Sequence, residues 1–146
     1  MTENVLVTIK GLQFSSGDEQ AIEIINLGKF SEINGKLYVK YDEMLEGENR
    51  LTSNLIKIGE NSVEITKKGP VTAHLLFNAN EKTMTYYDTP FGSLYMGIFS
   101  RSLEIDKNED SIRISIDYSL EVNYEELSDC KVTILIKPQD ANVKLI

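Results

Sequence analysis

The segment SIRISIDYSLEVN, residues 111–123, alternates apolar and polar side chains without interruption. Successive side chains of a β-strand point to opposite faces, so the segment predicts a long strand with one dry face and one wet face. At about 3.3 Å per residue it spans about 43 Å, whereas an ordinary strand has about five or six residues. We expect such a strand to curve or to carry a bulge, as in antiparallel sheets that close into barrels. The residues expected to be buried are Ile112, Ile114, Ile116, Tyr118 and Leu120, and those expected to be exposed are Arg113, Ser115, Asp117 and Ser119.

Shorter alternating segments fill the rest of the chain, separated by polar or turn-forming clusters. Together they predict about ten strands near residues 5–12, 21–29, 36–43, 51–58, 62–66, 72–77, 82–88, 93–101, 111–123 and 130–137. Asn34-Gly35 fits a two-residue type I′ hairpin, in which both positions take positive φ. Ile25 breaks the alternation between Ile24 and Leu27, which predicts a bulge or a bend. Residues 124–128 could form one turn of helix.

The length and composition place the chain among ordinary globular proteins. It has 146 residues, of which 41% are hydrophobic and 26% charged, and no Pro- or Ser-rich linker divides it. We therefore expect a single domain over residues 1–146 with a core of its own. Short connections between successive strands favour an all-β fold, a single antiparallel meandering barrel of about eight to ten strands.

The charge and the cysteine content restrict the partners and the compartment. The formal net charge is −8, which argues against a nucleic-acid partner because phosphate binding relies on clustered Lys and Arg. No apolar run approaches the roughly twenty residues of a membrane-spanning helix, so we expect no membrane partner. The N-terminus lacks the basic and apolar regions of a signal peptide, which predicts a cytoplasmic protein. Cys130 is the only cysteine, so neither an intrachain disulfide nor a Cys-based zinc site can form.

Three segments resemble a known family. Thr52–Ile58, Val63–Gly69 and above all Tyr87–Leu94 (YDTPFGSL), followed by the long alternating strand, are similar to the YwiB-like family of small bacterial β-barrel proteins. The resemblance extends over nearly the whole chain. It implies an uncharacterised cytoplasmic barrel that resembles the lipocalin-like calycins, with no activity or catalytic residues to carry over.

The sequence contains no catalytic signature. His74 is the only histidine and lies by parity on the wetter face of its strand, so a structural or exposed role is favoured. Cys130 is expected to be a small apolar core residue. The carboxylates at 42–43, 46–48, 109–110 and 125–126 lack EF-hand spacing and are interpreted as solvated acidic loops. We expect no enzyme, no metal and no cofactor.

The stretch from Met84 to Phe99 is rich in aromatic residues and methionine. A barrel of about eight strands is just wide enough to be filled by side chains or to hold one small ligand. Tyr and Met are suited to line such a pocket, although they can equally serve as filling. The predicted ligand-binding residues, all expected to point inward, are Tyr41, Met84, Tyr86, Met96 and Tyr118.

Two functions follow from this pattern. The first is a non-enzymatic binding protein for a small, partly apolar ligand in the lumen. Such a pocket should leave a tyrosine hydroxyl, or Arg101, facing it without a protein partner. The alternative is a protein–protein interaction or oligomerisation module, such as a homodimer, with a solid barrel and exposed aromatic residues.

Overall fold

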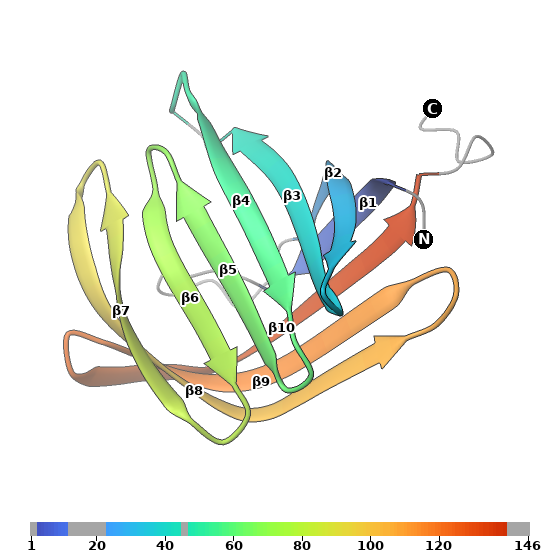
Figure 1. The fold of residues 1–146 in the computed structure, drawn as a ribbon. Coiled ribbons are helices and arrows are strands. Elements are labelled where there is room, and N and C mark those ends of the chain that lie inside the picture. The colour runs from blue at the N-terminus through green and yellow to red at the C-terminus, as the bar shows by residue number, and fades with distance from the viewer. Residues whose placement is uncertain (1–2, 12–22, 45–46, 140–146) are drawn as a thin grey trace.

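The described residues form one closed antiparallel barrel of ten strands (Figure 1). The computed structural model describes residues 3–11, 23–44 and 47–139. The strands are β1 (Asn4–Lys10), β2 (Glu23–Ile33), β3 (Lys36–Met44), β4 (Leu51–Ile58), β5 (Ser62–Lys68), β6 (Thr72–Asn78), β7 (Lys82–Thr89), β8 (Gly92–Lys107), β9 (Ile112–Val122) and β10 (Glu125–Pro138). Each strand pairs with its neighbours in sequence, and β1 closes the barrel by pairing with β10. The predicted fold class is therefore confirmed.

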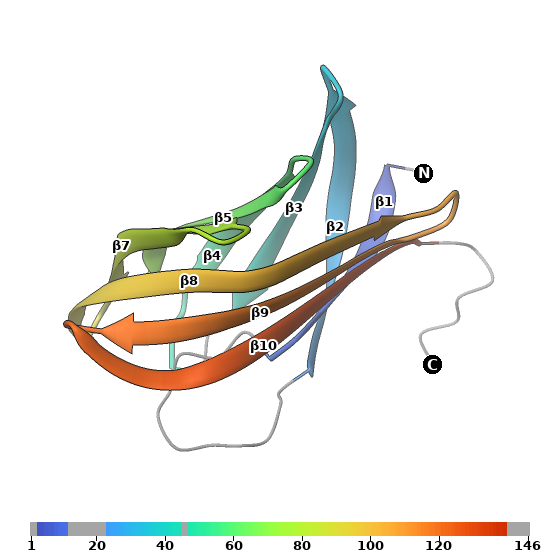
Figure 2. The same cartoon turned by 90° about the horizontal axis from the view of Figure 1, so that it is seen from below.

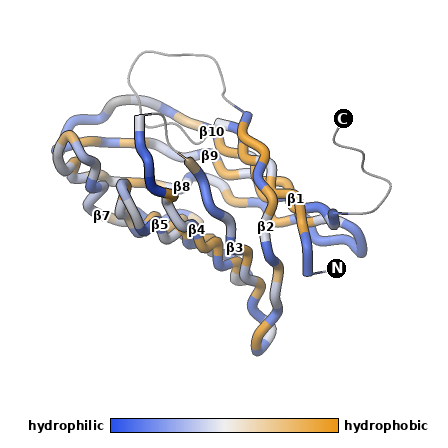
Figure 3. Tube along the Cα trace, turned by 90° about the horizontal axis from the view of Figure 1, so that it is seen from above, coloured by the Kyte–Doolittle hydropathy of each residue, from blue (hydrophilic) through white to orange (hydrophobic). Residues whose placement is uncertain are grey.

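The apolar face of β9 is buried as the alternation predicts. Ile112, Ile114, Ile116, Tyr118 and Leu120 expose between 0% and 3% of their surface. Arg113 is exposed as predicted, whereas Ser115, Asp117 and Ser119 are half-buried, so the prediction that they are exposed is wrong. Ser102 of β8 and Asp129 of β10 contact Asp117 and Ser119 on the outer face. The alternation of hydrophobic and hydrophilic positions along the strands is visible in Figure 3. Buried side chains from β1, from β3 to β6 and from β8 to β10 meet in one apolar cluster, against which Phe30 of β2 and Tyr87 of β7 pack.

The two longest strands, β8 and β10, lie on either side of β9. β8, β9 and β10 run together as long curved strands along one side of the barrel (Figure 2). The ladder between β8 and β9 shifts register between Ser100 and Ser102, and the ladder between β10 and β9 shifts between Glu126 and Ser128. The irregularities expected for this long strand thus lie in its two partners, where they increase the twist.

Two local predictions are wrong and one is confirmed. β2 has no bulge near Ile25, because its register with β1 runs unbroken from Lys10↔Glu23 to Asn4↔Lys29. Ile25 instead faces outward and is 58% exposed. No helical turn forms at residues 124–128, since β10 begins at Glu125 and pairs with the end of β9. Asn34 and Gly35 form the predicted turn, with φ of 52° and 78°.

The ladder between β6 and β7 is the shortest in the barrel. It consists of Thr72↔Asp88 and Ala73↔Tyr87, after which the two strands diverge. Further along, the Thr83 hydroxyl donates to the Leu76 carbonyl at 2.6 Å. β7 continues instead along β8, with which it pairs over its whole length.

Candidate functional site

A buried polar group lies at the end of the barrel where β3 ends, β4 begins and β5 ends. The Lys67 ammonium donates to Glu43 Oε1 at 2.7 Å and to Asn54 Oδ1 at 2.8 Å, and Asn54 Nδ2 donates to the same Glu43 oxygen at 3.1 Å. The side chains of Lys67 and Glu43 are only 7% and 12% exposed. With Tyr41 and Tyr87, these residues are called the mouth cluster below.

The surroundings of the two tyrosines in the mouth cluster raise the pKa of both phenols. Burial, followed by the charge of Glu43, raises the pKa of Tyr87 to about 12. Burial also raises the pKa of Tyr41, with smaller contributions from Glu43 and Tyr87. Both phenols therefore stay protonated at neutral pH and can donate hydrogen bonds.

The sequence pattern does not predict the mouth cluster, and it places Glu43 in a solvated loop. That prediction is wrong, because Glu43 continues the inward parity of Val39 and Tyr41 on β3. Lys67 likewise follows Val63 and Ile65 on the inward face of β5. The signal available in the sequence is a charged residue at the next inward position of a strand whose other inward positions are apolar. The pairing itself joins positions 24 residues apart and cannot be read from local pattern.

A second polar group lies deeper, among apolar side chains. Tyr118 is fully buried, and its ring packs edge-on against Phe77 with centroids 5.4 Å apart. The Cys130 thiol, a weak hydrogen-bonding group, lies beside its hydroxyl. Within the described part of the chain, that hydroxyl makes no hydrogen bond of ordinary geometry. Ser100 lies directly opposite on β8, and its buried hydroxyl is also unpaired.

The structure divides the five predicted ligand-binding residues between inside and outside. Tyr41, Met96 and Tyr118 are buried, with 4%, 0% and 0% of their surface exposed. Met84 and Tyr86 are 37% and 63% exposed, so the expectation that they point inward is wrong. The physical reason lies in the register of β7, which pairs Tyr87 with inward-facing Ala73 and Leu94. Its even-numbered positions therefore face outward.

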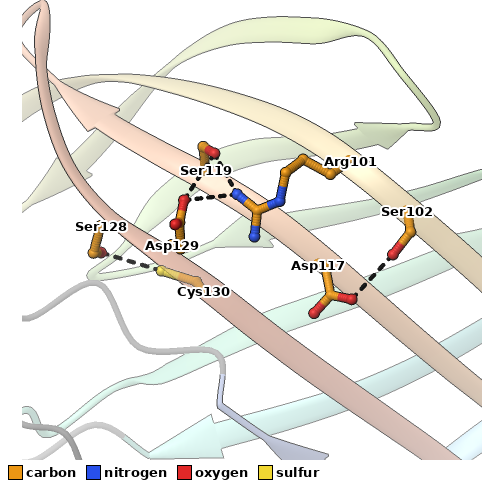
Figure 4. Close-up of polar contacts among 7 residues, drawn as sticks. All are labelled: Arg101, Ser102, Asp117, Ser119, Ser128, Asp129 and Cys130. Carbon is orange, nitrogen blue, oxygen red and sulfur yellow. Dashed lines mark hydrogen bonds and ion pairs between the residues drawn. The ribbon is translucent and has the colours of Figure 1, made fainter.

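Arg101 lies at the bulge of β8 and is tied to the outer face (Figure 4). Its guanidinium donates to Asp129 at 2.7 Å and also to the hydroxyl of Ser119. It is therefore not a free group facing the lumen. Cys130 is half-buried against the core, with its sulfur 3.3 Å from the Ser128 hydroxyl.

The other residues considered for chemistry offer no reactive arrangement. His74 is exposed, as expected, and its Nε2 lies 3.0 Å from a Glu64 carboxylate oxygen. Among the described residues, no three His, Cys, Asp or Glu side chains lie close enough to hold a metal ion. An open groove of about 270 Å³ lies over β8 and β9, lined by Glu104, Ile105, Asp106, Arg113 and Ser115. It contains none of the predicted ligand-binding residues.

The fold and the interior define a small closed β-barrel of uncharacterised function. The chain belongs to the family described as "Domain of unknown function (DUF1934)", whose model matches residues 7–134. It is 25% identical over 122 residues to the "Uncharacterized beta-barrel protein YwiB" of Bacillus subtilis (strain 168), covering 84% of each chain. The crystal structure of the ywiB protein from Bacillus subtilis has the same fold, with a TM-score of 0.79 and 22% identity over 94% of this chain and 93% of that one. No described segment is a helix long and apolar enough to cross a membrane.

Proposed function

We propose that the protein is a non-enzymatic cytoplasmic binding protein for a small, partly apolar ligand, whose polar end is recognised by the mouth cluster. The observation that carries the proposal is the burial of Lys67 with Glu43 and Asn54 inside a barrel whose buried side chains are mostly apolar. Removing charges from water costs several kcal/mol per ion, and apolar side chains would often serve stability as well or better. A charged group kept inside the barrel therefore points to recognition.

The apolar part of the proposed site continues along the strands from the mouth cluster, first at Met96, two residues from Leu94, and further on at Tyr118, which packs on Phe77. Met96 and Tyr118 present a thioether and an aromatic ring inside the barrel, as small-ligand sites commonly do. Among the described residues, the buried hydroxyls of Tyr118, Ser100 and Thr52 make no hydrogen bond of ordinary geometry, and a ligand or a water molecule would satisfy them. Closed meandering barrels such as lipocalins hold one small ligand in the barrel interior.

The experiment is a titration with anilinonaphthalenesulfonate, an apolar fluorophore with one polar group, followed by its emission and by amide NMR shifts. The wild-type chain should bind it at one saturable site whose shifts include Tyr41 and Tyr87. Met96→Phe should weaken binding because it fills the lumen, whereas Met84→Phe, on the outer face, should not. These two methionines make a matched pair.

A second pair tests the polar end. The double variant Lys67→Met/Glu43→Gln removes both charges of the mouth cluster and should weaken binding, while Lys68→Met, at the adjacent exposed position, should not. Urea unfolding verifies that each variant is folded. The proposal is wrong if the wild-type chain shows no saturable site, or if both members of each pair bind alike.

A further inference from the structure

Three tyrosines form a continuous aromatic strip on the outside of the barrel. Tyr86 of β7 lies directly opposite Tyr95 of β8, with ring centroids 4.8 Å apart. Tyr124, in the turn between β9 and β10, packs on the other side of Tyr95 at 5.6 Å. Tyr86 is 63% exposed and Tyr124 is 77% exposed. The rings of this tyrosine strip lie outside the apolar core, and two of the three are largely exposed to solvent.

The turn holds Tyr124 in a costly conformation. Its φ is +70°, in the left-handed region that bulky residues rarely occupy. The preceding Asn123 fixes the turn to β8: its amide donates to the Tyr95 carbonyl at 2.7 Å, and its side-chain oxygen accepts from the Tyr95 amide at 3.2 Å. Glycine would serve this turn with less strain. A strained, well-braced and exposed tyrosine suggests that its ring is presented for binding.

Carboxylates surround the tyrosine strip. Glu121 and Glu126 face each other across β9 and β10 on the outer face, an arrangement of like charges that destabilises a sheet. Lys82 pairs with Glu121 at 2.6 Å, and within the described ranges Glu126 has no cationic partner. Asp88 lies two residues beyond Tyr86 on the same face of β7. Three carboxylates thus accompany one ammonium.

The Glu121 side chain also lies over β8, beside the tyrosine strip. Gly97 lies opposite it on β8, and a Cβ at Gly97 would come within 2.7 Å of the Glu121 side chain. The missing side chain lets the carboxylate lie across β8, between the tyrosine strip and Phe99. The Glu121 carboxylate therefore lies next to the aromatic rings on the same outer face.

We propose that the tyrosine strip and the Glu121–Glu126 pair form a docking site for an arginine-containing peptide segment of another protein. A guanidinium can stack on a tyrosine ring while its N–H groups donate to a carboxylate, which an ammonium cannot do in the same way. The partner's positive charge would also relieve the repulsion between the two glutamates. This inference does not depend on a ligand in the lumen.

The experiment titrates the labelled full-length chain with a short Gly-Arg repeat peptide and follows its amide NMR shifts. The largest shifts should map to Tyr86, Tyr95 and Tyr124, and the same peptide with Lys in place of Arg should bind several-fold more weakly. Tyr124→Gly should lower the affinity about tenfold, the equivalent of a good cation–π contact. Because glycine suits the φ of this position, that variant should keep or raise the urea midpoint.

Controls separate this site from general attraction to an acidic protein. Glu126→Gln should weaken binding, whereas Tyr38→Ala, on the outer face of β3, should leave it unchanged. Equal affinity for the Arg and Lys peptides, or shifts spread away from the strip, would overturn the proposal. It would also be overturned if sedimentation showed a dimer that Tyr124→Gly dissociates, since the strip would then be covered by a second copy.

Discussion

Ile116 lies in the middle of β9 with none of its surface exposed, and its register partners are Leu103 and Val132. Replacing it with alanine leaves a cavity in the core, so Ile116→Ala should lower the free energy of unfolding by about 2 to 5 kcal/mol. Ser115→Ala, one residue away on the outer face, should cost little. Urea unfolding measures both. Equal midpoints for the two variants would contradict the assignment of the core to this face.

Lys67 and Glu43 allow a second test at the scale of single side chains. Lys67→Met alone leaves the Glu43 charge buried without its partner and should cost about 3 to 5 kcal/mol of stability. The double variant Lys67→Met/Glu43→Gln removes both charges and should be more stable than the single one. Chemical denaturation of the four proteins of this cycle gives the coupling energy. A double variant no more stable than Lys67→Met would show that the charge left behind is not the source of the loss.

The strand β7 shows why the candidate site could be predicted only in part. Both of its parities carry aromatic residues, Tyr86 on one and Tyr87 on the other, so alternation alone cannot decide which faces inward. Long-range pairing with Ala73 and Leu94 decides in favour of Tyr87. Tyr41 and Tyr118, in strands with a single clear apolar parity, were correctly predicted to be buried.

The limits of a strand can be predicted from the sequence where turn-forming residues mark its ends. The bounds of β4 agree with those predicted because turn-forming residues lie at both ends, although polar Thr52 and Asn54 occupy inward positions. β8 was predicted to end at 101 but continues to Lys107. At its bulge the inward positions change from Ile98 and Ser100 to Leu103 and Ile105, so the alternation changes phase. A bulge looks like the end of a strand when only the pattern is considered.

The short ladder between β6 and β7 should make these strands the least protected elements of the barrel. Few backbone hydrogen bonds join them beyond Thr72 and Ala73, whereas β8 and β9 pair over most of their length. Local opening follows the density of such interactions. Amide hydrogen exchange should therefore be faster at His74 and Leu76 of β6, whose backbone groups point towards β7, than at Ile114 and Ile116 on β9. Equal protection of both pairs would mean that the barrel opens only as a unit.

The closed barrel as a whole keeps three of the seven tyrosines in surroundings that disfavour the phenolate, and this predicts its response to alkali. Tyr87 has a pKa of about 12 in the folded chain against the ordinary tyrosine value of 10.0, and burial also raises the pKa of Tyr41 and Tyr118. Between these values the unfolded chain releases protons that the folded chain retains, so the free energy of unfolding is unaffected below pH 10 and decreases as the pH rises towards 12. Urea midpoints measured across this range should fall, and tyrosinate absorbance should show a late group of tyrosines that ionises together with unfolding.

Tyr87→Phe should reduce the dependence on pH, while Tyr86→Phe, on the exposed outer face, should not. A midpoint that stays constant through this range would show that water reaches the interior tyrosines in the folded barrel.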